Sequence, residues 1–269
     1  MKKSLTGAGG LPRKLSAILL SAAMLVMGLA MAADNSIYID QTGDNASVTI
    51  NQDGGGNAVR GLPGVGTSNS TPATIYGDGN QVSVSQVGSG NTLKLGVKTD
   101  TSIGQSTINY SVTGSNANGI IQVGNAQTNS SANTINVIQN GDNATASVKS
   151  IGASNTATIN TAGGANNSVA LGMLGDNITS TINVTGGGAN ALALDLQSPG
   201  GTATVTAVGA SNQVNLAQTG GVNGHSATVD LTGSGNIVGI QQQGTAGDNT
   251  VNLKSVGNTN TFSINQNNR

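Results

Sequence analysis

Polar and apolar residues alternate along this chain in short blocks, and one block recurs over most of its length. The block reads Asn-x-φ-x-φ-x-Gln, where φ is an apolar residue. Because side chains of a β-strand point to alternate faces, the four marked positions of a block lie on one side of a strand. Each block therefore predicts a short strand whose inner face has two aliphatic side chains between two amides. The amides of the six intact blocks are Asn35 and Gln41, Asn80 and Gln86, Asn133 and Gln139, Asn212 and Gln218, Asn236 and Gln242, and Asn260 and Gln266.

Other segments keep the shape of the block with one marked position changed. A seventh copy runs from Asn116 to Gln122 and has Asn118 at one apolar position. Four further blocks end in a residue other than Gln, and they begin at Asn91, Asn155, Asn190 and Asn249. Glycine-rich segments join consecutive blocks, and Gly and Asn tolerate the positive φ angles of tight corners. The chain is thus expected to alternate strand and turn.

The spacing of the blocks near the C-terminal end predicts how the strands are arranged. Asn212, Asn236 and Asn260 are 24 residues apart, and another block lies between each pair. About two strands per coil of 22–26 residues would place like residues above one another, so the expected fold is all-β, a β-solenoid or cross-β stack of strand-turn-strand repeats. At a strand spacing of about 4.8 Å, stacked amides can form hydrogen-bonded ladders beside a dry aliphatic seam. The alternative is a disordered polar tract, but such a tract would not keep aliphatic and amide positions in register over six copies.

The N-terminal segment reads as a secretory signal peptide. Residues 1–32 combine a basic start, a mostly apolar run over residues 15–29 and an Ala-x-Ala cleavage signature at residues 30–32. The alternative is an uncleaved N-terminal anchor. No other segment is apolar enough to span a bilayer, so the mature chain is expected to have no transmembrane segment.

The remainder divides into a first repeat pair at 33–57, a Pro- and Gly-containing loop or linker at 58–79, and a β-solenoid repeat domain at 80–269. A Pro-Gly-Gly segment predicts an interruption of that domain near 198–201. Proline cannot donate to a sheet ladder, so the linker is expected to lie outside the stack. Arg60 would then be its most accessible tryptic site.

Composition favours a structural protein over an enzyme. The chain has four aromatic residues, no cysteine and no glutamate. Removing residues 1–32 takes four of the ten basic residues and none of the eleven Asp, which leaves 6 − 11 = −5, so nucleic acid is not an expected partner. A fold that lacks both large side chains and disulfides must be stabilised by repeated backbone hydrogen bonds.

No constellation in the sequence supports catalysis, metal binding or cofactor binding. His225 is the only histidine, and its neighbours Gly224 and Ser226 predict a solvated loop position and not a catalytic base. Four aspartates each precede an Asn in a Gly-containing turn, which raises the alternative of calcium binding: Asp44, Asp142, Asp176 and Asp248. One carboxylate per turn is a thin ligand set for an ion that takes six to eight oxygens, so a turn role is favoured.

The turns themselves follow a known pattern. Residues 86–91 and 218–223 read Gln-x-Gly-x-x-Asn, and residues 41–45 and 139–143 read the same with one residue deleted. This pattern resembles the centre of the repeat of the curlins, the subunits of the bacterial extracellular amyloid fibres called curli. The curlin repeat reads Ser-x5-Gln-x-Gly-x-x-Asn-x-Ala-x3-Gln.

The chain also departs from the curlin repeat. Asn80 stands at a position of the leading Ser, Leu93 at an Ala position and Val97 at a position of the final Gln. The likeness extends loosely over residues 35–57 and 80–269, and it is tight in only a few units. It implies a curlin-like subunit that is secreted through an outer-membrane channel, meets a nucleator subunit and assembles outside the cell. It does not distinguish a major subunit from a nucleator.

Self-assembly is the function that this combination predicts. Solenoid strands have open edges, and only three residues follow Gln266, none of which would cap a sheet. The expected partner is the protein itself in a homopolymer, with a role in biofilm matrix and surface adhesion. The alternative is a non-polymerising β-solenoid adhesin that binds a ligand on a flat Thr- and Asn-rich face, with segments such as residues 202–206. A solenoid enzyme of the pectin-lyase kind would need clustered acids and bases that the sequence lacks.

Overall fold

The computed structural model describes residues 34–62, 72–99, 105–124, 131–221 and 223–268, and these belong to one compact unit, Asp34–Arg269. The signal peptide expected at 1–32 lies outside the described residues. The unit is all-β: parallel strands stack into a β-solenoid of about nine coils, with equivalent strands roughly 24 residues apart. The expected fold class is therefore confirmed. The described residues include no helix long and apolar enough to cross a bilayer.

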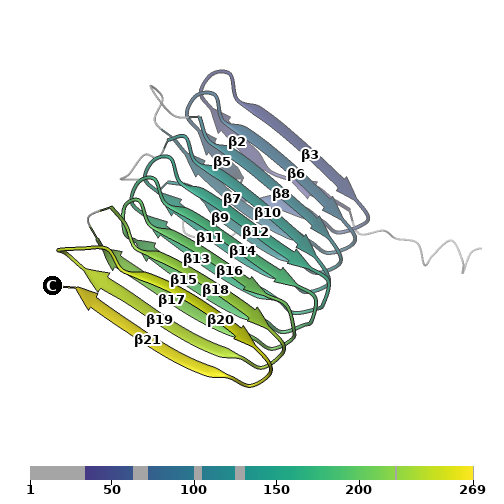
Figure 1. Cartoon of the computed structure of the whole chain (residues 1–269). Helices are drawn as coiled ribbons and strands as arrows, with labels where there is room; N and C mark the ends of the chain where they lie inside the picture. Colours follow the sequence, from purple (N-terminus) through teal and green to yellow (C-terminus); the bar gives the residue numbers. More distant parts are fainter. Residues whose placement is uncertain (1–33, 63–71, 100–104, 125–130, 222, 269) are drawn as a thin grey trace, which may run out of the picture. The chain divides into compact units, whose positions relative to one another are not determined.

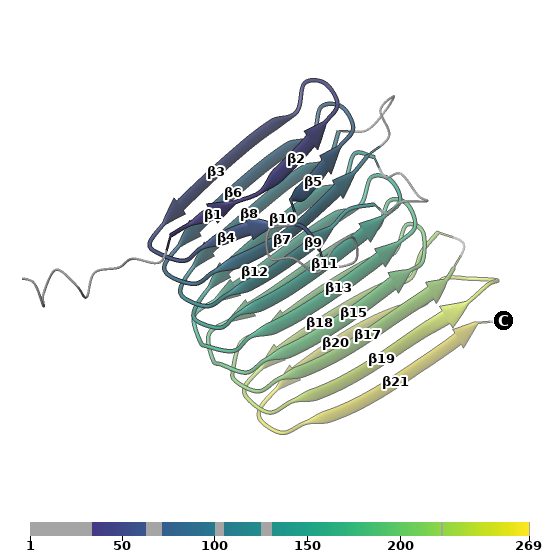
Figure 2. The same ribbon diagram turned by 180° about the vertical axis from the view of Figure 1, so that it is seen from behind.

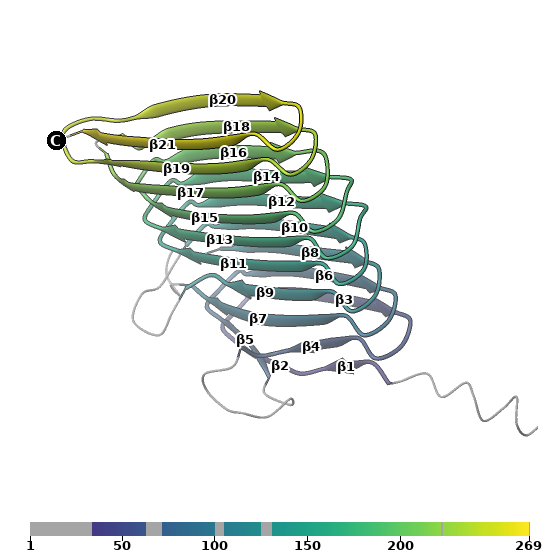
Figure 3. The ribbon, with the colours of Figure 1, turned by 90° about the horizontal axis from the view of Figure 1, so that it is seen from below.

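Each coil contributes one strand level to each of two facing walls (Figures 1 and 3). Wall A is a 12-stranded sheet and wall B a 9-stranded sheet, and every pairing between neighbouring strands is parallel and in one-to-one register. The strands of wall A are β1 (Ser36–Ile37), β2 (Ile39–Thr42), β4 (Ala58–Arg60), β5 (Ala73–Tyr76), β7 (Thr92–Lys98), β9 (Asn118–Gln122), β11 (Thr145–Ile151), β13 (Ser168–Leu174), β15 (Ala191–Gln197), β17 (Gln213–Gly220), β19 (Ile237–Gly244) and β21 (Thr261–Asn268). Those of wall B are β3 (Ser47–Asp53), β6 (Gln81–Val87), β8 (Thr107–Thr113), β10 (Thr134–Asn140), β12 (Thr156–Ala162), β14 (Thr179–Thr185), β16 (Thr202–Ala207), β18 (Ser226–Thr232) and β20 (Thr250–Val256).

The core is the aliphatic seam between the walls. In β10 the side chains of Ile135 and Val137 are buried, and Ala157 and Ile159 of β12 stack on them in register. Intervening residues face solvent, as the alternation predicts. Buried aliphatic area is small per residue, so the fold depends on many repeated layers, each hydrogen-bonded to the next.

One large side chain lies in this seam. Tyr110 of β8 is buried, and its hydroxyl donates a hydrogen bond to Oε1 of Gln139 at 2.8 Å. Desolvation by burial raises the pKa of Tyr110 far above its usual value. A Cβ at Gly119 of β9 would lie 2.5 Å from the tyrosine ring, so this glycine makes room for it. The small residue on one wall thus complements the large one on the other.

The prediction for the seventh block, Asn116 to Gln122, was wrong by one residue in register. In β9 the inner residues are Gly119 and Ile121, whereas Asn118 faces outward. The cause lies at the corner before the strand, where Asn116 adopts a positive φ of 57°. The corner therefore ends one residue later than the pattern suggested, and Ala117 takes the position that Asn takes in other coils.

The segment 58–79 is not a linker outside the stack, and that prediction was wrong. Its ends form β4 and β5, which occupy one strand level of wall A, because both pair with β7 (Figure 2). Arg60 lies within β4, where the residue is partly buried and its Nε atom is enclosed, so it is not part of a loop. Pro72 immediately precedes β5, and Pro63 lies outside the described residues.

The interruption expected at residues 198–201 is an ordinary corner. Gly200 donates its N–H to the carbonyl of Asp176 at 2.9 Å, in the same register as the strands on either side. Pro199 fits because the proline is exposed at the tip of the corner, where a missing N–H leaves no ladder bond unmade. The solenoid therefore continues without a break.

Candidate functional site

The inner asparagines form one column on each wall, and where Asn occupies a column position its side chain connects one coil to the next. On wall A the column consists of Asn35, Asn57, Asn91, Ala117, Ala144, Asn167, Asn190, Asn212, Asn236 and Asn260. A typical member, Asn212, accepts the backbone N–H of Asn236 on its Oδ1 at 3.0 Å. Its Nδ2 donates to the carbonyl of Gly233 at 2.9 Å. Each amide thus satisfies a corner donor and a corner acceptor that the strand ladder leaves unpaired.

Wall B has the equivalent column, with more exceptions to Asn. Its members include Asn80, Ser106, Asn133, Asn155, Ile178, His225 and Asn249. Asn133 accepts the N–H of Asn155 at 2.9 Å, and its Nδ2 donates to the carbonyl of Gly152 at 2.9 Å. Of the predicted Asn positions, Asn35, Asn212, Asn236 and Asn260 therefore stack on wall A, whereas Asn80 and Asn133 stack on wall B.

The glutamines form short ladders at the two ends of the solenoid and not one continuous ladder. On wall A, Gln218 donates to Gln242 at 2.9 Å, and Gln242 donates to Gln266 at 3.0 Å. On wall B, Gln52 donates to Gln86 at 2.7 Å. Between the ends, the same columns contain aliphatic, Met, Ser or Thr side chains, and Gln139 on wall B is the one amide.

Two predicted ladder residues have no amide neighbour in their column. Gln41 stacks on Ile75 and donates instead to the carbonyl of Gly43 in its own turn at 2.7 Å. Gln139 lies between Val112 and Thr161, and its Nε2 atom is enclosed without a partner among the described residues. Both assignments to an amide ladder within the chain were wrong.

Several column members were missed because the block does not mark them. Gln52 follows Val48 and Ile50 in a block that begins with Ala46 instead of Asn. Asn57 starts a block whose strand ends at Arg60, just before residues that break the pattern. Asn167 starts a block that ends in Met173. The alternation of apolar residues after each Asn was the signal that could have found them.

His225 is not a solvated loop residue. It is fully buried and occupies the Asn column of wall B. Its Nδ1 atom accepts the N–H of Asn249 at 3.0 Å, so Nε2 carries the proton and donates to the carbonyl of Thr219 at 3.1 Å. The ring thus makes the same kind of contacts as the asparagines, with an acceptor toward the next coil and a donor toward a corner. The prediction was wrong because Gly224 and Ser226 are residues typical of an exposed loop.

The corner aspartates also bind backbone groups. Oδ1 of Asp142 accepts the N–H of Ser115 at 2.7 Å, and Oδ1 of Asp176 accepts that of Ala153 at 2.7 Å. Asn258 makes the same contact with Ser234 at 2.7 Å, so a neutral amide can replace the carboxylate. Among the described residues, no three acidic, His or Cys side chains gather where they could hold a metal ion.

Both ends of the described solenoid expose their core. The partly buried apolar residues that pack against the core are Ile39, Val48 and Ile50 in the first coil, and Leu253, Phe262 and Ile264 in the last. By contrast, Ile240 and Leu216, which lie directly under Ile264, are 3% and 0% exposed. β20 and β21 each pair with a neighbour on one side only. The two ends therefore present unsatisfied strand edges together with apolar side chains.

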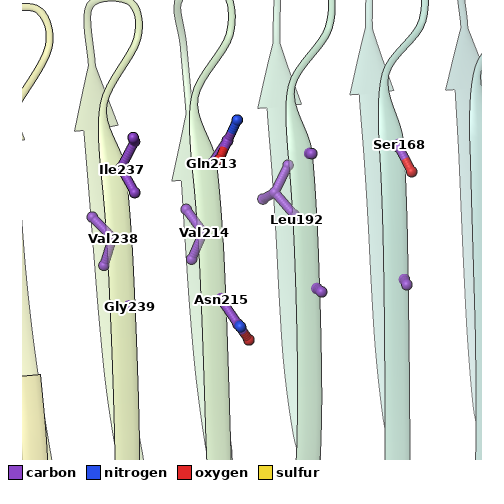
Figure 4. A pocket seen from close by; sticks show the side chains of 11 residues that line it. Ser168, Leu192, Gln213, Val214, Asn215, Ile237, Val238 and Gly239 are labelled. Carbon is purple, nitrogen blue, oxygen red and sulfur yellow. The ribbon is translucent and has the colours of Figure 1, made fainter. Parts of the chain in front are cut away.

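The outer face of wall A is hollowed where its residues are small. A shallow depression of about 380 Å³ crosses β13, β15, β17 and β19, and Ala170, Ala193 and Gly239 form its floor. Figure 4 shows Gln213, Asn215 and the apolar Ile237 around it. No charged residue lines this depression, and its polar groups do not converge on one point, so it has no feature of a catalytic site.

Comparisons with protein-family models, curated proteins and solved structures found no match for this chain. The class that the coordinates define is thus a parallel β-solenoid, and its function has to be argued from its own columns, faces and ends.

The Gln ladder of wall A provides a first test of what the columns do. We expect the triple replacement Gln218→Leu, Gln242→Leu and Gln266→Leu to leave the fold intact, because Leu196 occupies the same column one coil earlier. Ordered assembly should become slower, since amide bonds fix register and an aliphatic seam does not. Two quantities are measured: the rate of fibre formation, and the order of the fibres in fibre diffraction. Equal rates and equal order would show that these amides are incidental.

Proposed function

We propose that this protein is a secreted structural subunit that self-assembles end to end into curli-like extracellular amyloid fibres. The observation that carries the proposal is the open core at both ends of the solenoid. Phe262 and Ile264 are only partly buried at one end, and so are Ile39 and Val48 at the other. Each buried square ångström of apolar surface contributes about 25 cal/mol, and an unpaired strand edge is a template for another strand. A second copy stacked on β21 would cover both on wall A, whose strand order begins at β1 and ends at β21.

The last and first coils also match in register. If β21 pairs with β1 and β2 of the next copy, as β19 pairs with β21, then Asn260 stacks on Asn35 and Gln266 stacks on Gln41. Both columns on wall A would continue across the junction. Gln41, which has no amide neighbour in its own chain, would gain one. On the apolar positions, Ile264 would meet Ile39.

Charge favours this head-to-tail arrangement. The first coil carries four aspartates, Asp34, Asp40, Asp44 and Asp53, and no basic residue. Residues 250–268 carry no acidic residue and one Lys, Lys254. Two first coils brought together would juxtapose eight carboxylates, whereas a first coil on a last coil places them beside a neutral or positive surface.

Disulfide trapping tests both the assembly and its register, because the chain has no cysteine. Asp40 of β2 and Asn265 of β21 both face outward, and in the proposed junction they are direct neighbours. Neighbouring strands are about 4.8 Å apart, a separation that a disulfide can span. We expect the chain with Asp40→Cys and Asn265→Cys to give a ladder of covalent oligomers under oxidising conditions, visible on a non-reducing gel.

The matched control moves one thiol one coil inward. Gln241 lies in the same outer column as Asn265, so Asp40→Cys with Gln241→Cys would hold the thiols about 9.6 Å apart and should not cross-link. The single variants Asp40→Cys and Asn265→Cys test whether two identical ends meet. Either variant would form a covalent dimer only if two copies joined through the same end. Protein that stays monomeric at high concentration and yields no ladder would exclude end-to-end assembly.

The role that follows is that of a building block of biofilm matrix and surface adhesion. A nucleator subunit and an outer-membrane secretion channel are the partners that the curlin resemblance implies. A discrete, non-polymerising adhesin would instead sediment as a monomer with both ends exposed, so sedimentation of freshly purified protein distinguishes these two functions.

A further inference from the structure

The outer face of wall B has a two-dimensional order that the core does not require. Three successive strands, β12, β14 and β16, each present Thr-x-Thr toward solvent, and the threonines are stacked in register. The pairs are Thr156 and Thr158, Thr179 and Thr181, and Thr202 and Thr204. The rows on both sides, in β8, β10, β18 and β20, keep Thr or Ser at the first position and Thr or Asn at the second. The result is a lattice of small polar side chains, seven rows long and two columns wide, with only threonines in its three central rows.

Strand propensity alone does not account for this lattice. Threonine is a good strand former, so a purely structural preference would place it on the outside of both walls. The equivalent outer positions of wall A instead hold Ala170 and Ala193, followed by Asn215 and Gly239. Wall A has the same parallel strands and the same inner columns, yet its outer face is irregular and hollowed (Figure 4). Regularity is confined to one face of a fold that imposes equal spacing on both.

The spacing of the lattice identifies the kind of ligand. Adjacent rows are about 4.8 Å apart, and the two columns are two residues apart along the strand, or about 6.7 Å. Water oxygens on the prism face of hexagonal ice repeat at closely similar distances in two perpendicular directions. Because every strand of the lattice except the edge strand β20 is hydrogen-bonded to two neighbours, the lattice is rigid and loses little entropy on binding. A single polysaccharide chain repeats in only one direction and would not need two matched columns.

The chemistry of the face agrees with the spacing. None of the strands β8, β10, β12, β14 and β16 contains a charged residue, so no charge lies in these five rows to disturb an ordered water layer. In β18 and β20 the ion pair of Asp230 and Lys254 lies one outer position beyond the two columns. Each threonine offers a hydroxyl that bonds water and a methyl group that holds water around it. We therefore propose that the outer face of wall B binds ice, through first-layer waters anchored on its threonine lattice. This proposal does not depend on self-assembly, because the face lies on the sides of the solenoid and not at its ends.

The experiment compares a bulky substitution on each wall of the full-length mature protein. Thr181→Tyr places a ring in the middle of the lattice, and Ala193→Tyr places the same ring at the equivalent outer position of wall A. Tyrosine is a good strand former, so both variants should fold. The measurements are thermal hysteresis (the difference between the melting and freezing temperatures), the shape of ice crystals, and the fraction of protein incorporated into slowly growing ice. The wild type and Ala193→Tyr should adsorb to ice, whereas Thr181→Tyr should lose activity several-fold.

Other outcomes would overturn the proposal. A wild type that neither shapes ice nor enters it, or an equal loss in both variants, means that the face does not bind ice. Retention on microcrystalline cellulose or chitin that is lost in Thr181→Tyr, without any effect on ice, assigns the face to a crystalline polysaccharide. Circular dichroism verifies folding, and if Thr181→Tyr is unfolded, the double variant Thr158→Ser and Thr181→Ser provides the test. It keeps the hydroxyls and removes the methyl groups, so ice activity should again fall several-fold, and unchanged activity would reject the proposal.

Discussion

Gly88→Ala is expected to destabilise the solenoid by at least about 3 kcal/mol, which for a domain of this size lowers the melting temperature by roughly 10 °C. Gly88 forms a corner with φ of 114°, a conformation that side chains rarely adopt. An added Cβ would overlap the carbonyl oxygen of Gly114 in the next coil. Because that carbonyl belongs to backbone held by ladder hydrogen bonds, neither layer can move away without disrupting the other. Thermal unfolding followed by circular dichroism measures the effect.

A second glycine provides the matched control. Gly172 lies within β13 on the outer face of wall A, and a Cβ there would find its nearest atom, Oδ1 of Asp195, at 3.8 Å. Gly172→Ala should therefore change stability by less than about 1 kcal/mol, and a small gain would follow from the lower entropy of the unfolded chain. If both variants melted at the same temperature, close stacking at the Gly88 corner would not limit the stability of the fold.

Periodicity predicted the stack because only one arrangement buries every aliphatic position. The spacing of Asn212, Asn236 and Asn260 requires two strands per coil, and the structure pairs these strands in register. The inward direction of the aliphatics follows from the alternation within each block. These features depend on local repetition, which a sequence displays directly.

The errors arose where a residue's neighbours in space differ from its neighbours in sequence. Gln41 completes a block, yet the residue above it is Ile75, because the insertion within the next strand level places β5 there. His225 resembles a loop residue in sequence, and only the column shows that it replaces an asparagine. The proline-containing segment was read as a linker, since no local pattern shows that its two ends belong to one strand level.

The threonine lattice depends on the same distinction. Each Thr-x-Thr is unremarkable within its own strand, and the sequence gives no reason to connect residue 158 with residue 204. Register makes them members of one column. Faces formed in this way can acquire a function without altering the core, because outward residues do not take part in inner packing. This is why the two walls can differ outside while they remain equivalent inside.

The last coil offers the sharpest test of end-to-end growth. Ile264 points toward the core but is only partly buried, because no strand of the described chain covers it. A charged residue there remains in contact with water in the monomer. In the proposed junction it would be enclosed against Ile39 of the next copy, where an unpaired charge costs several kcal/mol. A charge at this position should therefore destabilise the junction far more than it destabilises the folded monomer.

We expect Ile264→Lys to abolish fibre growth while it lowers the stability of the monomer by no more than about 2 kcal/mol. The variant keeps an intact first coil, so it can still add to the last coil of a growing wild-type fibre and then prevent further addition. A small fraction of Ile264→Lys should consequently shorten wild-type fibres out of proportion to its amount, as measured by fibre length in electron micrographs. Ser263→Lys, whose side chain faces solvent on the same strand, is the control and should assemble normally. If Ile264→Lys assembled as fast as Ser263→Lys, growth would not proceed through the open core of the last coil.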